Sequence, residues 1–132
     1  MRLYRLYVSD WAELVVTQDN LDRRFINRAI SEYIELEVEL QLEYFGLVCV
    51  KELGRIPLPR LEVLNLSYND LKFIPDLSLC SNLKTLILRN NLLVEIPGLQ
   101  NLFNLEYLDI RNNRLNKPLD VSSLTNLSVI RT

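Results

Sequence analysis

Apolar and polar residues follow a pattern that recurs every 22 residues through the second half of the chain. The segments 61–82, 83–104 and 105–126 follow one another without a gap. Each has leucine or isoleucine at its first, fourth and sixth positions, asparagine at the ninth and leucine at the eleventh. Three copies at one fixed period indicate a repeat architecture in which each copy is one structural unit.

The alternation at the start of each copy, such as Leu64-Asn65-Leu66, predicts a short strand with its leucines pointing inward. The rest of each copy must return the chain to the start of the next strand, so successive strands are expected to pair in parallel. Proline has no amide to donate to a ladder, which places Pro75 and Pro97 in these returns. The third copy has Pro118 after a lysine instead of an isoleucine, so its return is expected to differ.

Asparagine recurs where the chain leaves each strand, at Asn69, Asn91 and Asn113. A buried amide side chain can accept from one backbone group and donate to others. We therefore predict a structural ladder that joins neighbouring copies, rather than a ligand site. Cys80 stands where the next copies have leucine and is predicted to be a core residue.

Two incomplete copies flank the regular ones. Residues 34–44 alternate with a period of two, which predicts a strand, and Leu40 and Leu42 take the inward positions of an irregular copy over 37–60, with Phe45 in place of asparagine. Residues 127–132 begin a further copy and end with its strand. We expect an open edge there, which fits either a module cut from a longer protein or a chain whose end is covered by a partner.

The start of the chain has a different period. Leu21, Phe25, Ala29 and Tyr33 recur every four residues and predict an amphipathic helix over about 20–33. Its apolar stripe could serve a partner, but covering the open end of a repeat core is the simpler interpretation. The expected domain organisation is an N-terminal helical cap at 1–36 and repeats at 37–132. The expected fold class is α/β, a solenoid with a parallel β-sheet on its concave face.

Composition excludes several classes of function. The net charge of −2 gives no basic footprint for nucleic acid, and no apolar run is long enough for a membrane span. The chain has no histidine, no glycine-rich phosphate loop and no cysteine pair at metal-binding spacing, so we expect neither enzyme activity nor a cofactor or metal. The alternating Glu35, Glu37, Glu39 and Glu43 indicate one solvated strand face rather than an acid–base pair.

The better candidate site is the concave face, onto which the residues between the inward leucines project. It would combine aromatic residues, which are enriched at interface anchors, with an apolar centre and a gradient from acidic to basic charge. The alternative is that these residues are ordinary exposed strand residues chosen for β-propensity. The predicted protein-binding set is Tyr44, Val63, Asn65, Tyr68, Ile87, Arg89, Tyr107, Asp109 and Arg111.

The pattern L-x-x-L-x-L-x-x-N-x-L, with a second apolar set at Ile96, Leu99 and Leu102, resembles leucine-rich repeats. The 22-residue form is similar to the subfamily that includes regulatory subunits of type-1 protein phosphatase and axonemal leucine-rich proteins. That resemblance covers about residues 37–132 and implies a protein that binds other proteins and is not itself an enzyme. Secreted members usually carry cysteine-rich caps, whereas this chain has two cysteines, so an intracellular setting, cytoplasmic or nuclear, is expected.

A narrower resemblance concerns residues 21–47, LDRRFINRAISEYIELEVELQLEYFGL. This stretch is similar to the junction before the C-terminal leucine-rich domain of the Rab geranylgeranyltransferase α subunit, where the repeats are an appendage and catalysis lies elsewhere. Two hypotheses therefore remain open. The chain is either an adaptor or regulatory subunit that binds a protein on its concave face, or a structural module that joins a larger complex through its open C-terminal end.

Overall fold

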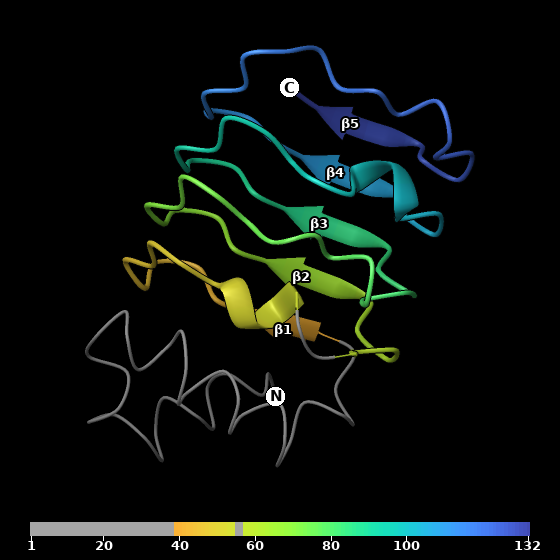
Figure 1. The fold of residues 1–132 in the computed structure, drawn as a ribbon, viewed down its shortest axis with the longest axis horizontal. Coiled ribbons are helices and arrows are strands. Elements are labelled where there is room, and N and C mark those ends of the chain that lie inside the picture. The colour runs from red at the N-terminus through yellow and green to blue at the C-terminus, as the bar shows by residue number, and fades with distance from the viewer. Residues whose placement is uncertain (1–38, 55–56) are drawn as a thin grey trace.

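The computed structural model describes residues 39–54 and 57–132. Five short strands form one parallel sheet in chain order: β1 (Glu39–Gln41), β2 (Val63–Asn65), β3 (Thr85–Ile87), β4 (Tyr107–Asp109) and β5 (Val129–Arg131). Figure 1 shows them stacked from β1 to β5 like the rungs of a ladder. The predicted solenoid with a parallel sheet is confirmed, whereas the predicted helix at about 20–33, the cap at 1–36 and the first part of the predicted strand at 34–44 lie outside the described residues.

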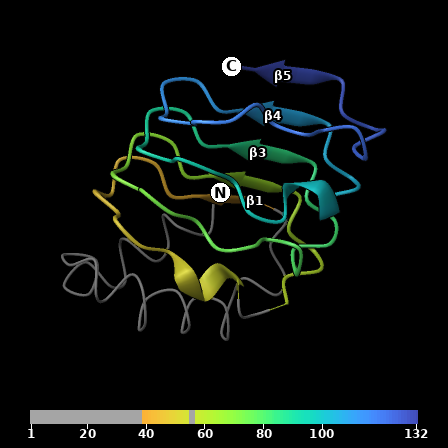
Figure 2. The ribbon, with the colours of Figure 1, turned by 45° about the horizontal axis from the view of Figure 1, so that its top comes forward.

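The strand register matches the alignment of the repeat copies. The residues that stand opposite one another across the five strands are the aligned Leu40, Leu64, Leu86, Leu108 and Ile130. The chain returns between strands through irregular segments that include two 3-10 helices, η3 (Lys51–Gly54) and η4 (Leu99–Asn101). Figure 2 shows these segments on one side of the sheet, so the opposite face of the sheet is the concave one.

The core lies between the sheet and the return segments. Leucines that follow the strands, such as Leu42, Leu66 and Leu88, are fully buried, and so is Leu77 in a return segment. Cys80 is buried as predicted, and burial raises the pKa of its thiol to about 11. The third return differs from the second, as expected from its proline: Pro118 is exposed where the preceding copy buries Ile96.

The predicted asparagine ladder is confirmed. The side-chain carbonyl of Asn91 accepts the Leu71 N–H at 3.1 Å, and its amide donates to the Leu66 and Leu88 carbonyls at 2.9 and 3.1 Å. Asn69 and Asn113 make the same kinds of bond one copy earlier and one copy later. Each asparagine thus joins its own turn to the copy before it and holds the turns that follow the strands in one shape.

Candidate protein-binding surface

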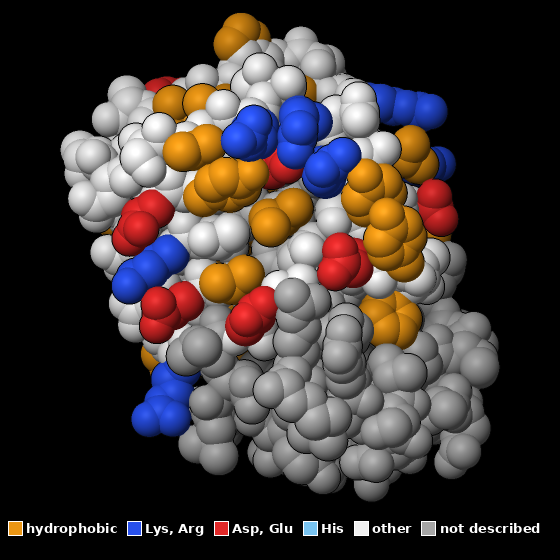
Figure 3. All heavy atoms as spheres, turned by 180° about the vertical axis from the view of Figure 1, so that it is seen from behind, with side chains coloured by type: hydrophobic (Ala, Val, Ile, Leu, Met, Phe, Trp, Pro, Cys, Tyr) orange, Lys and Arg blue, Asp and Glu red, His pale blue; other side chains and the backbone are white. Residues whose placement is uncertain are grey.

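Side chains of three kinds are unevenly distributed over the concave face. Figure 3 shows Lys and Arg side chains gathered toward the β5 end of the sheet with an acidic side chain among them, hydrophobic side chains across the middle and further Asp and Glu side chains toward the β1 end. The strand register aligns the residues that carry this pattern into rows that run across the sheet.

One row consists of the residues that immediately precede the ladder positions. Tyr44, Tyr68, Asn90 and Asn112 all adopt left-handed backbone conformations, with φ of 63°, 57°, 58° and 56°. The Tyr68 and Asn90 amides donate to carbonyls of the next copy at 3.0 and 2.9 Å, so pairing between copies holds this geometry in place. Asparagine tolerates the left-handed region, whereas a bulky residue there is an outlier. Two copies therefore place a tyrosine where the other two use the residue that the backbone prefers.

The two tyrosines form a stacked pair. The centroids of the Tyr44 and Tyr68 rings lie 4.5 Å apart and the ring planes differ by 13°. The Arg89 guanidinium carbon lies 5.2 Å from the Tyr68 ring centroid, within the range of a cation–π contact. Tyr44 nevertheless remains 68% exposed, so the pair presents a large aromatic surface to solvent.

The row formed by the last strand residues contains three buried polar side chains, those of Gln41, Asn65 and Asp109, of which the last two belong to the predicted set. Asn65 accepts hydrogen bonds from the Ser67 N–H and hydroxyl at 3.1 and 2.6 Å, and its amide donates to Gln41 at 2.9 Å. Asp109 accepts the Arg111 N–H in the same way, at 3.2 Å. Their exposed fractions are 8% and 2%, so these two members of the predicted set hold the turn in position instead of presenting a surface.

Asp109 and Arg111 form a two-pronged ion pair. The Arg111 Nε and Nη2 donate to the two carboxylate oxygens at 3.0 and 2.7 Å. Burial is the largest single influence on the pKa of Asp109 and raises it, but the hydrogen bonds from Arg111 and the charges of Arg111 and Arg89 together outweigh it. The pKa of Asp109 is therefore lowered, and the carboxylate stays ionised beside its partner.

Between the acidic side chains toward the β1 end and the basic side chains toward the β5 end, the face is apolar. Val63 and Ile87, on neighbouring strands, are each partly exposed. Ile87 takes the row position of Asn65 and Asp109 but carries no acceptor for the turn. Tyr107 is half-buried, and its hydroxyl accepts a hydrogen bond from the Arg131 Nε at 3.0 Å.

The structure thus brings the predicted residues onto one face, but not with equal exposure. Seven of the nine are at least partly exposed, and Asn65 and Asp109 are not. Arg131, which stands opposite Asp109 in the pairing of β4 with β5, also contributes to this face but is not in the predicted set. Sequence reasoning missed the left-handed backbone at Tyr44 and Tyr68, although their alignment with Asn90 and Asn112 was a readable signal.

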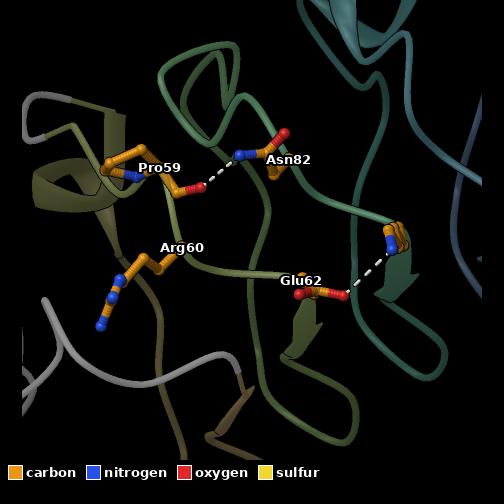
Figure 4. A pocket seen from close by; sticks show the side chains of 5 residues that line it. Pro59, Arg60, Glu62 and Asn82 are labelled. Atoms are coloured by element: carbon orange, nitrogen blue, oxygen red, sulfur yellow. Dashed lines mark hydrogen bonds and ion pairs between the residues drawn. The ribbon is translucent and has the colours of Figure 1, made fainter.

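A shallow hollow lies away from this face, beside the starts of β2 and β3 (Figure 4). It is lined by Pro59, Arg60, Glu62, Asn82 and Lys84. Lys84 pairs with Glu62 at 3.2 Å, and the Asn82 amide donates to the Pro59 carbonyl. Both contacts join one copy to the next, so we assign the hollow to the packing between copies.

Two further tests concern the described part of the chain. It contains no group of three or more histidine, cysteine, aspartate or glutamate side chains arranged to hold a metal ion. Among the same residues, no helix has the length and apolar character that crossing a membrane requires.

Comparison with known families agrees with the repeat pattern. The family described as "Leucine Rich repeats (2 copies)" matches residues 59–101, and "Leucine Rich Repeat" matches residues 104–127. Together the two matches cover about half of the 132 residues. No curated protein matches the chain.

Proposed function

This chain belongs to the leucine-rich repeat family, whose domains typically mediate protein binding, and on that premise we propose that it is an adaptor or regulatory subunit that binds a protein on its concave face. The proposed contact residues are Tyr44, Val63, Tyr68, Ile87, Arg89, Tyr107 and Arg111, with Arg131 added. The buried side chains of Asn65 and Asp109 position Ser67 and Arg111 by hydrogen bonds. A reducing compartment, cytoplasmic or nuclear, forms part of the same proposal.

The observation that carries this proposal is the tyrosine pair. A left-handed conformation costs an L-residue about 1–2 kcal/mol, and Asn90 and Asn112 show that this backbone accepts the residue type that tolerates it best. Residues held in strained backbone conformations cluster at functional sites, so the outliers Tyr44 and Tyr68 support a functional role. Stacked, solvent-exposed tyrosines supply what interface anchors need, which is a large contact area already held in one orientation.

The test is affinity purification from the source cell, with bound proteins identified by mass spectrometry. The Tyr44→Asn/Tyr68→Asn variant copies the residues of the other two copies, so it removes the aromatic surface while keeping the backbone geometry. Phe73 and Phe103 are 66% and 59% exposed in return segments, and their double alanine variant is the matched control. We expect a partner that is lost from the tyrosine variant and retained by the control.

The alternative is the structural module that joins a complex through its ends. It predicts partners that the tyrosine variant retains and that are lost when Ile130, 41% exposed on β5, is changed to Asp. A partner lost only from the phenylalanine control would move the binding surface to the return segments. Either result would contradict the concave-face proposal.

A further inference from the structure

Arg131 lies in β5, and Arg89 and Arg111 lie two residues after the ends of β3 and β4. Figure 3 shows Lys and Arg side chains gathered on this part of the concave face. From the contacts of these three arginines we infer that this half of the face receives an acidic segment of the partner protein, whose carboxylates bind Arg89 and Arg131 while an adjoining apolar side chain packs on Val63 and Ile87. This inference rests on the proposed function and adds the chemistry of the partner.

The charges of the three arginines are not equally compensated. Arg111 is neutralised by the two-pronged contact with Asp109. Arg89 has neutral partners, the Tyr68 ring and the Asn90 side chain, and Arg131 has the Tyr107 hydroxyl. Within residues 39–54 and 57–132, the only carboxylate paired with these three arginines is that of Asp109. Two positive charges therefore remain on this surface, although the whole chain carries a net charge of −2.

The contacts also orient the two arginines. Both use Nε for their side-chain hydrogen bonds, Arg89 to Asn90 at 3.4 Å and Arg131 to Tyr107 at 3.0 Å. In the described chain their terminal nitrogens make no hydrogen bond, so the end of each guanidinium is available. Two parallel N–H groups at that end match the two oxygens of a carboxylate. Because neutral groups already hold the side chains, less conformational entropy is lost when an anion binds.

The rest of the face gives the bound segment a direction. Glu39 and Glu43 lie at the β1 end, where they accept hydrogen bonds from Gln41 and Asn65. An acidic residue placed there would meet like charge, which favours the opposite orientation. Val63 and Ile87 lie between the two ends and are only partly exposed. A segment with acidic residues at one end and an apolar residue beside them satisfies both regions at once.

The experiment selects random short peptides, displayed on phage, against the folded full chain. We expect the selected peptides to be rich in aspartate and glutamate beside an apolar residue. Arg89→Gln/Arg131→Gln should weaken their binding, measured by fluorescence anisotropy, by about tenfold or more, since each substitution removes charge-assisted hydrogen bonds. Added salt should weaken binding to the wild type more than to this variant.

Lys72→Gln/Lys117→Gln is the matched control, because it removes two positive charges from exposed residues in the return segments. This control should bind the peptides like the wild type, and circular dichroism should show the same thermal transition for all three proteins. Single-stranded RNA is the competing polyanion. Binding to RNA as tight as to the peptides, with the same dependence on Arg89 and Arg131, would overturn the assignment to an acidic protein segment.

Two further outcomes separate this inference from the proposed function. Selected peptides that lack acidic residues, and whose binding is lost in Tyr44→Asn/Tyr68→Asn but kept in Arg89→Gln/Arg131→Gln, would refute the inference and leave the concave-face proposal standing. Failure to select any peptide that depends on the tyrosines or the arginines would count against both.

Discussion

Two adjacent rows of residues cross this sheet one position apart in sequence, and they behave differently. Asn69, Asn91 and Asn113 form the ladder row, and the residues just before them, Tyr68, Asn90 and Asn112, form the second row. The ladder side chains bond buried backbone groups of two copies at once, which only an amide of that size can do. The residues of the second row share a left-handed backbone conformation, but their side chains do not bond buried backbone groups of two copies in this way.

The difference shows where a repeat protein of this kind can vary. A position constrained by side-chain hydrogen bonds within the fold repeats its residue in every regular copy. A position constrained only by φ can carry a tyrosine in some copies, at a cost of about 1–2 kcal/mol each. Residues that depart from the local preference of the backbone, such as Tyr44 and Tyr68, are therefore the ones most informative about binding.

The largest expected contrast comes from substitutions at the neighbouring positions Asn91 and Asn90. Asn91→Ala leaves the Leu71 N–H and two carbonyls without their partner, so it should lower the free energy of unfolding by about 1–3 kcal/mol. Asn90→Gly, its control, removes a hydrogen bond to Asn112 at 3.3 Å and one to Arg89, while glycine adopts the left-handed backbone of this position without strain, so it should cost less than about 1 kcal/mol. Urea unfolding followed by circular dichroism measures both, and equal losses would erase the distinction between the rows.

A smaller effect is expected from the Asp109–Arg111 ion pair beside the second row, and the pH dependence of the unfolding free energy tests it. The pKa of Asp109 is lower in the folded state, so the pair stabilises the protein above the unfolded pKa of about 3.9, and this contribution is lost as pH falls through the folded pKa. Asp109→Asn should cost about 1 kcal/mol at pH 7, since Arg111 is partly exposed.

The same measurement repeated at lower pH provides the check. The difference in unfolding free energy between the wild type and Asp109→Asn should shrink as the solution is acidified below about pH 4. A difference that stays constant with pH would mean that the Asp109 carboxylate does not stabilise the fold through its charge. Asn91→Ala supplies the comparison, because the ladder side chain is neutral and its cost should not follow this titration.

The smallest effect is expected at the tyrosine pair. Tyr68→Asn relieves the left-handed backbone but loses the stacking with Tyr44, two terms of about 1 kcal/mol with opposite sign. Its unfolding free energy should therefore stay within about 1 kcal/mol of the wild type, while the partner is lost. A loss of stability as large as that of Asn91→Ala would make Tyr68 a structural residue and weaken the case for binding.

Much of the fold could be predicted from the sequence, because aligning the repeat copies also gives the register in which their strands pair. The period of 22 residues aligned the leucines that the strands pair, and it identified Asn69, Asn91 and Asn113 as a ladder before any geometry was known. The same pattern anticipated that Cys80 is buried and that the return around Pro118 differs. These features depend on residue size and backbone bonding, which the repeat pattern expresses directly.

The candidate surface was only partly predictable. Alternation placed residues on the concave face but could not show that Asp109 is buried and bonded to Arg111, or that Arg131 meets Tyr107. Those outcomes depend on hydrogen bonds between side chains, some within one copy and some between neighbouring copies. Several possible partners lie within reach of a long side chain, and the sequence pattern does not select among them.

Strand register and core packing in this protein follow from the repeat pattern alone, because each copy imposes the same volume and the same turn bonds on the next. The distribution of charge on the concave face was decided by the assembled structure. Only the assembled structure settles that Asp109 neutralises Arg111, two positions along the chain, and that Tyr68 and Tyr107 contact Arg89 and Arg131 of the next copy.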